Sequence, residues 1–109
     1  MAYDESLARR VRVHLADESD LYERKMFGGL AFMVRGNMCC GIVGDELMVR
    51  VGPVQYAAAL AQSHAREMDF TGRPMTGMVM VATEGLSSDA ALEEWIRQAI
   101  TFVSSLPPK

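Results

Sequence analysis

A glycine-interrupted apolar run near the middle of the chain constrains the fold most. Residues 25–34 (KMFGGLAFMV) continue across residues 35–37 (RGN) into residues 38–43 (MCCGIV), so two strand-like segments meet at a turn. The Gly-Asn pair in this turn tolerates the positive φ of a tight reversal. Gly28 and Gly29 remove side chains from both faces of the first segment, which predicts a bulge or the close approach of another backbone. We expect this hairpin to form the centre of a sheet.

Helical periodicity occurs at both ends of the chain. From Asp4 to about Asp17, apolar residues recur at helical spacing, and the Asp4 carboxylate is placed to cap the first turn. Near the C-terminus, a helix with a wide apolar stripe follows Ser88, its expected N-cap, and ends before residues 107–108 (PP). These two segments are predicted to be amphipathic helices that pack on the sheet.

A short alanine-rich segment predicts one more helix in the middle of the chain. Residues 52–53 (GP) stop the preceding strand, and a proline suits the first position of a helix. The predicted helix spans Val54 to about Ser63, with Tyr56 and Leu60 facing inward.

Three further segments are predicted to be strands, at residues 47–51, 65–70 and 78–82. In the last of these, methionines alternate with valines, so both faces of the strand are apolar. The element order α-β(3)-α-β(2)-α predicts a two-layer α+β domain with a mostly antiparallel sheet of five strands. Because an open sheet normally leaves one face wet, we expect a partner to cover the second apolar face.

Composition limits the classes of protein that the chain can belong to. The chain has 109 residues, of which half are hydrophobic, so residues 1–109 are expected to form one domain. The net charge of -3 argues against direct nucleic-acid binding, which depends on a field of Lys and Arg. Neither a signal peptide nor an apolar stretch of the ~20 residues that a membrane helix needs is apparent, so a cytoplasmic location without membrane contact is expected.

No pattern of catalytic or metal-binding residues stands out. The only soft ligands are His14, Cys39, Cys40 and His64, and adjacent cysteines on an extended strand point to opposite faces. We therefore expect no metal and no cofactor, one cysteine in the core, and one on a sheet face. If that second cysteine faces solvent, it is a candidate for oxidation.

The motifs resemble those of the TfoX N-terminal domain family. The resemblance lies in residues 25–32 (KMFGGLAF), 37–41 (NMCCG), 47–51 (LMVRV) and 68–75 (MDFTGRPM), and in the helix that contains Trp95. It implies a fold similar to that of the type III secretion chaperones, often dimeric. In full-length TfoX/Sxy regulators this domain precedes a second domain and the protein promotes competence-gene expression. The family offers no established catalytic residues.

Two functional hypotheses follow from these observations. The first is a non-catalytic protein-association domain that forms a homodimer or binds another protein, in a role linked to transcriptional regulation. The second is a small-ligand-binding or enzymatic domain with its site between the sheet and the second helix. The candidate ligand or interface residues for the two hypotheses are Phe27, Gly28, Gly29, Arg50, Tyr56 and Arg73.

Overall fold

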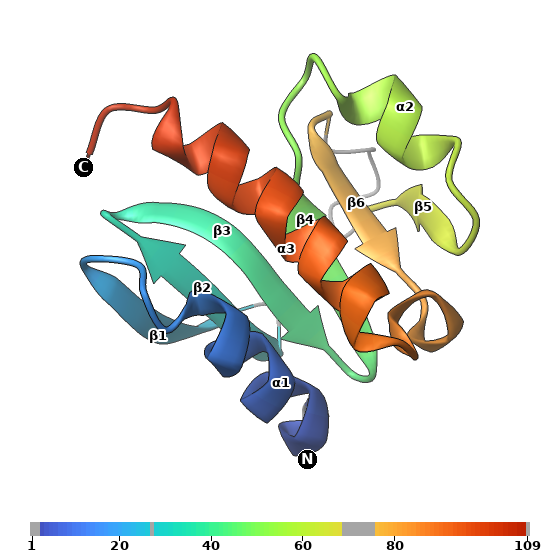
Figure 1. Cartoon of the computed structure of the whole chain (residues 1–109), viewed down its shortest axis with the longest axis horizontal. Coiled ribbons are helices and arrows are strands. Elements are labelled where there is room, and N and C mark those ends of the chain that lie inside the picture. The colour runs from blue at the N-terminus through green and yellow to red at the C-terminus, as the bar shows by residue number, and fades with distance from the viewer. Residues whose placement is uncertain (1–2, 27, 69–75, 109) are drawn as a thin grey trace.

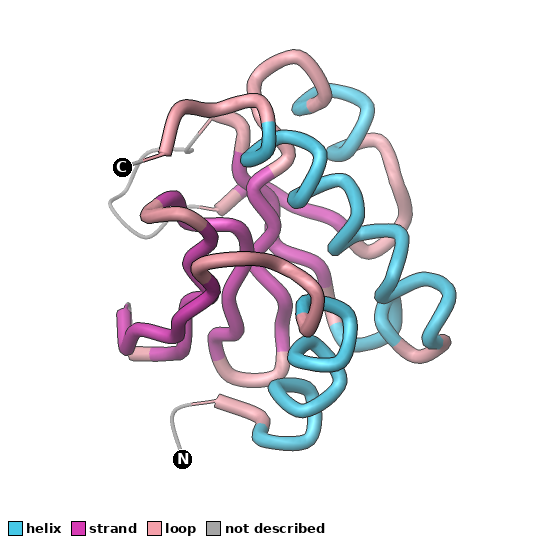
Figure 2. Tube along the Cα trace, turned by 60° about the vertical axis from the view of Figure 1, so that its left-hand side comes forward, coloured by secondary structure: helices cyan, strands magenta, loops and turns pink. Residues whose placement is uncertain are grey.

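The chain folds into one sheet with its helices packed on one side (Figures 1 and 2). The computed structural model describes residues 3–26, 28–68 and 76–108. The helices are α1 (Glu5–Leu15), α2 (Tyr56–Leu60) and α3 (Asp89–Ser104), with a 3-10 turn, η1 (Thr83–Leu86), before α3. The strands are β1 (Leu21–Met26), β2 (Gly29–Val34), β3 (Asn37–Val43), β4 (Glu46–Arg50), β5 (Ala65–Glu67) and β6 (Met78–Val81). The predicted two-layer α+β class is confirmed.

Within the described residues the sheet has six strands, where the sequence predicted five. Its spatial order is β1-β2-β3-β4-β6-β5, and every neighbouring pair is antiparallel. The additional strand is β1, whose residues between Leu21 and Met26 are charged or aromatic and largely exposed. Such a strand lacks the apolar alternation that identifies strands in a sequence. Its charges also protect this edge of the sheet from pairing with another chain.

The two central glycines have different roles. Gly28 has a φ of +73° and lies in the turn where the chain reverses between β1 and β2, so the first apolar segment is a hairpin and not one bent strand. Gly29 begins β2, and a Cβ there would overlap the backbone carbonyl of Ile42 on β3. The predicted close approach of another backbone is therefore confirmed at Gly29.

A β-bulge in β3 places the two cysteines together. Phe32 of β2 pairs with Cys40 while Met33 pairs with Met38, so Cys39 is the extra residue. Both cysteines are fully buried and belong to the same core cluster. The prediction that they point to opposite faces, with one in the core and one on a sheet face, is wrong, because the bulge interrupts the alternation of an extended strand.

The N-caps predicted from the sequence are present at α1 and α3. Asp4 Oδ1 accepts from the amides of Ser6 (2.9 Å) and Leu7 (3.2 Å), and Ser88 Oγ accepts from the amide of Ala91 (3.1 Å). The middle helix is shorter than predicted, and the proline at position 53 precedes it without starting it. Among the described residues, no helix combines the length and hydrophobicity that crossing a membrane requires.

The two faces of the sheet have different cores. The helix face, covered by α1 and α3, is built from leucine, isoleucine, valine and phenylalanine packed on Trp95 and Ile96 of α3. The opposite face, which we call the methionine face, has a cluster of buried methionines, with Met38 and Val43 packed against it. The buried members are Met48, Met68, Met78 and Met80. Because these four methionines are already buried within the single chain, they do not require a partner to cover them.

Candidate functional site

Arg50 lies at the end of β4, where the sheet meets the C-terminal half of α3. Its guanidinium carbon is 5.3 Å from the centre of the Phe102 ring, within the range of a cation–π contact. Its Nη1 donates to the carbonyl oxygen of Met38 at 3.3 Å. The guanidinium is thus fixed between a ring of α3 and the backbone of β3.

Gly52 allows Phe102 to approach the backbone that follows β4. Its φ is +87°, and a Cβ at this position would overlap the Phe102 ring. The amides of Val51 and Gly52 both donate to the carbonyl oxygen of Gly77, at 2.8 and 3.0 Å. These hydrogen bonds join the segment before β6 to the end of β4. The ring of Phe102 packs directly against the backbone of Gly52, which has no side chain.

Phe102 lines two of the cavities that the described residues form. The first, which we call the Arg50 cavity, has a volume of about 380 Å³ and is lined by Met38, Arg50, Gly52, Pro53, Thr76, Gly77, Met78 and Phe102. The second, the α3 groove, has a volume of about 420 Å³ and is lined by residues 51–55 together with Glu94, Arg97, Gln98, Thr101, Phe102 and Ser105. Both volumes fall within the range of ~300–1,000 Å³ that is typical of ligand sites.

The α3 groove is mainly apolar, with a polar rim. The Val51, Pro53, Val54 and Phe102 side chains supply apolar surface, and Val54 is 89% exposed. On the rim, Arg97 pairs with Glu94 one helical turn earlier, so their charges offset each other. The groove therefore offers apolar contact area without a strong field of either sign.

The candidate residues from the sequence do not form one site. Arg50 lines its cavity, whereas Tyr56 of α2 lines neither cavity and packs on the helix-face core. Gly28 and Gly29 lie at the β1–β2 turn, where Gly29 approaches Ile42 near the end of β3. Arg50 bonds to Met38, the second residue of β3, so the glycines and Arg50 lie at opposite ends of that strand. Phe27 and Arg73 lie outside the described residues.

Tyr56 has a shielded hydroxyl. The described residues give its oxygen no hydrogen-bond partner, and the atom is hidden from solvent. Desolvation, and to a smaller extent the nearby carboxylate of Glu67, raise the pKa of Tyr56. The phenol stays protonated at neutral pH, so it is suited to packing and hydrogen bonding and not to acting as a base.

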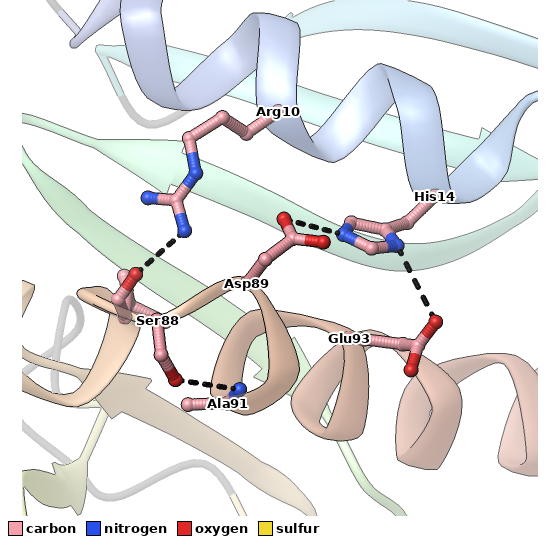
Figure 3. A network of polar contacts seen from close by, with 7 residues as sticks. Arg10, His14, Ser88, Asp89, Ala91 and Glu93 are labelled. Carbon is pink, nitrogen blue, oxygen red and sulfur yellow. Dashed lines mark hydrogen bonds and ion pairs between the residues drawn. The ribbon is translucent and has the colours of Figure 1, made fainter.

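A polar cluster joins α1 to the start of α3 (Figure 3). His14 Nε2 is 3.1 Å from Asp89 Oδ1, and His14 Nδ1 is 4.0 Å from Glu93 Oε2. Arg10 Nη2 donates to the carbonyl oxygen of Leu86 at 2.8 Å. The two carboxylates are mostly exposed, while the imidazole is nearly covered. We interpret this cluster as a tether between the two helices.

The cysteines are placed for packing and not for nucleophilic chemistry. A hydrogen bond with Cys39, together with burial, raises the pKa of Cys40 well above its ordinary value. A reactive cysteine needs the opposite shift and access to solvent. Within the described ranges, no group of three or more His, Cys, Asp or Glu side chains is arranged to hold a metal ion.

These features define a two-layer α+β domain with open grooves at one end of its sheet. The chain belongs to the TfoX N-terminal domain family, because the sequence model of that family matches residues 14–103. The family is linked to competence regulation. Searches of curated proteins and of solved structures found no match.

Sequence reasoning missed the two residues that shape the site around Arg50. Phe102 has the spacing of the apolar stripe of α3, and Gly52 has the position of a strand terminator. Phe102 does lie on α3 and Gly52 does follow β4, but neither pattern predicts that the two residues are in contact. One local feature of the sequence could have indicated this site. Gly52 follows Arg50 by two residues, which places a cation near a residue that is free to adopt positive φ.

Proposed function

We propose that the protein is a non-catalytic association domain that pairs with a second copy through the α3 groove. The observation that carries the proposal is the exposure of Val54 beside this apolar groove. Large apolar side chains that are exposed next to a concave apolar surface are typical of protein interaction sites. The association that the sequence analysis attributed to a second apolar sheet face is thus proposed at a different surface.

The α3 groove is suited to two-fold pairing. A two-fold interface uses the same patch on both subunits, so the patch must contain both a projection and a recess. Val54 supplies the projection, and the space above Phe102 and Thr101 supplies the recess. In the proposed dimer, Val54 of each subunit inserts into the groove of the other, and the polar side chains of Gln98 and Arg97 lie at the rim.

Within its family, the domain is proposed to act in the cytoplasm by binding proteins that regulate gene expression. The net charge of -3 supports protein contact over direct DNA contact, because DNA binding draws its affinity from Lys and Arg that neutralise phosphates. A partner other than a second copy would use the same groove, and the dimer would then compete with it.

Sedimentation velocity across micromolar to millimolar concentrations tests the pairing. Val54→Asp places a charge at the centre of the proposed interface and should weaken dimerisation at least about tenfold, which corresponds to ~1.4 kcal/mol. Val13→Asp is the matched control, because Val13 is also an exposed valine (74%) but lies on α1. The control should sediment like the wild type.

Two results would contradict the proposed pairing. One is a wild type that stays monomeric over the whole concentration range. The other is a Val54→Asp variant that dimerises as tightly as the wild type and the Val13→Asp control. Circular dichroism of both variants establishes that each is folded.

A further inference from the structure

We propose that the Arg50 cavity binds a small monocarboxylate that carries an apolar chain. This site goes beyond the proposed pairing, because Val54 lines the α3 groove and not the Arg50 cavity. Three observations carry the inference: the contacts of the guanidinium, the apolar walls around it, and the volume of the cavity.

The guanidinium of Arg50 is held in place but not neutralised by the residues that the structure describes. With the described residues it makes one hydrogen bond, to the carbonyl oxygen of Met38, and no described carboxylate lies within 4.0 Å. The face of Phe102 fixes its position. A guanidinium has five N–H donors in a rigid fork that matches a carboxylate, so donors remain for an anionic group.

The walls beside Arg50 are suited to an apolar chain. Met38, Met78 and Phe102 line the cavity, and Pro53 borders it. Methionine side chains are unbranched and polarizable, so they adapt to ligands of varied shape. A partly desolvated charge also attracts an anion more strongly than a charge in water does. The carboxylate would therefore lie at Arg50 and the chain along the two methionines.

The size and charge of the cavity favour a small monoanion. Its volume of about 380 Å³ admits a short aliphatic or aromatic acid. Among the described residues that line it, Arg50 is the single cationic side chain, which balances one negative charge. A phosphate group with two charges, or a run of acidic residues, would need more cations than this lining supplies.

Octanoate is the probe that tests this proposal. In a titration followed by the ε-methyl NMR signals of the nine methionines, we expect the signals of Met38 and Met78 to move most. Octanol has a similar chain without the charge, and acetate has the charge without the chain. Each should bind at least about tenfold more weakly than octanoate. Octanol that binds as tightly as octanoate would overturn the proposal, and so would shifts confined to other methionines.

Variants of Arg50 separate charge from geometry. Arg50→Gln should weaken octanoate binding at least about tenfold, and Arg50→Lys should give an intermediate loss, because lysine keeps the charge but not the planar fork. Arg66→Gln is the control: Arg66 is an exposed arginine on β5 that pairs with Glu46. Unchanged binding by a folded Arg50→Gln variant contradicts the proposal. The comparison of octanoate with octanol on the wild type remains decisive even if that variant fails to fold.

Two further measurements keep this site distinct from the pairing surface. Val54→Asp should bind octanoate as the wild type does, even where it no longer dimerises, because Val54 does not line the Arg50 cavity. A loss of octanoate binding in Val54→Asp would contradict the separation of the two sites. An acidic peptide that shifts Met38 and Met78 while octanoate does not would identify a protein ligand instead and would refute the small-molecule assignment.

Discussion

Branched aliphatic side chains fill the helix face of β4 and β6, whereas methionines fill the opposite face of the same strands. On β4, Leu47 and Val49 point to the helices and Met48 lies between them on the other side. Valine and methionine alternate in the same way along β6. Burial alone does not distinguish the faces, because both sets of residues are almost completely shielded from solvent.

The difference lies in how freely the side chains can rearrange. Valine and isoleucine have few rotamers, so they hold α3 against the sheet in one arrangement. Methionine has three rotatable bonds and adapts to irregular space. We infer that the helix face fixes the fold, while the methionine face can change shape where Met38 and Met78 border the Arg50 cavity.

The largest expected effect on stability comes from substitutions at two adjacent residues of β4, one on each face of the sheet. Leu47→Ala removes buried atoms among rigid neighbours and should lower the free energy of unfolding by ~4 kcal/mol, whereas Met48→Ala should lower it by ~2 kcal/mol because flexible methionines can fill the space. Urea denaturation of both variants measures the difference. Equal losses, or a larger loss for Met48→Ala, would remove the proposed contrast in rigidity between the faces.

The glycines of the β1–β2 hairpin give a test of intermediate size. Gly29→Ala should cost ~3 kcal/mol, because its Cβ overlaps the carbonyl of Ile42 and the strand must move. Gly28→Ala meets open space and should cost only ~1–2 kcal/mol, from the positive φ. Thermal unfolding of the two variants ranks them. If Gly28→Ala costs as much as Gly29→Ala, the turn conformation, and not the approach of the β3 backbone, would be the main reason for glycine at these positions.

The smallest effect is expected at the rim of the helix face, where Arg12 of α1 meets Glu23 of β1. The two guanidinium contacts, at 2.6 and 2.9 Å, lower the pKa of the Glu23 carboxyl below its ordinary value of 4.5. A lowered pKa adds stability above the unfolded pKa, and this stability is lost as the pH falls through the folded pKa. Because both side chains are more than a third exposed, Glu23→Gln should cost only ~0.5 kcal/mol at pH 7.

Denaturation at several pH values checks this ion pair. The difference between the wild type and Glu23→Gln should shrink as the pH falls below 4.5 and the native carboxyl becomes protonated. A difference that stays constant down to pH ~2, below the pKa of ordinary carboxyls, would show that packing and not charge explains the effect.

Much of the fold could be predicted from local patterns. The caps at Asp4 and Ser88 were identifiable because a side-chain oxygen before an amphipathic segment satisfies free amides of the first turn. The alternation in β6 was identifiable because strand side chains repeat every second residue. The backbone approach at Gly29 was also predicted, from the loss of side chains on both faces of the strand.

The missed features depend on contacts between distant parts of the chain. The polar edge strand β1 forms because β2 offers it a pairing edge, not because its own residues favour a strand. The bulge that brings Cys39 and Cys40 to the same core arises from the register between β2 and β3. For the same reason, Arg50 could be proposed as an anchor, but its partner Phe102 could not.

An NMR dilution series of the uniformly labelled protein tests the proposed pairing most directly, because it reports both the association and its location. As concentration rises from micromolar to millimolar, we predict that amide shifts concentrate at residues 51–55 and on the face of α3 that contains Gln98 and Thr101. The amide of Val13, on α1, should stay constant. A spectrum that does not change with concentration, or changes confined to the β1 edge, would contradict the proposal that the α3 groove is where two copies meet.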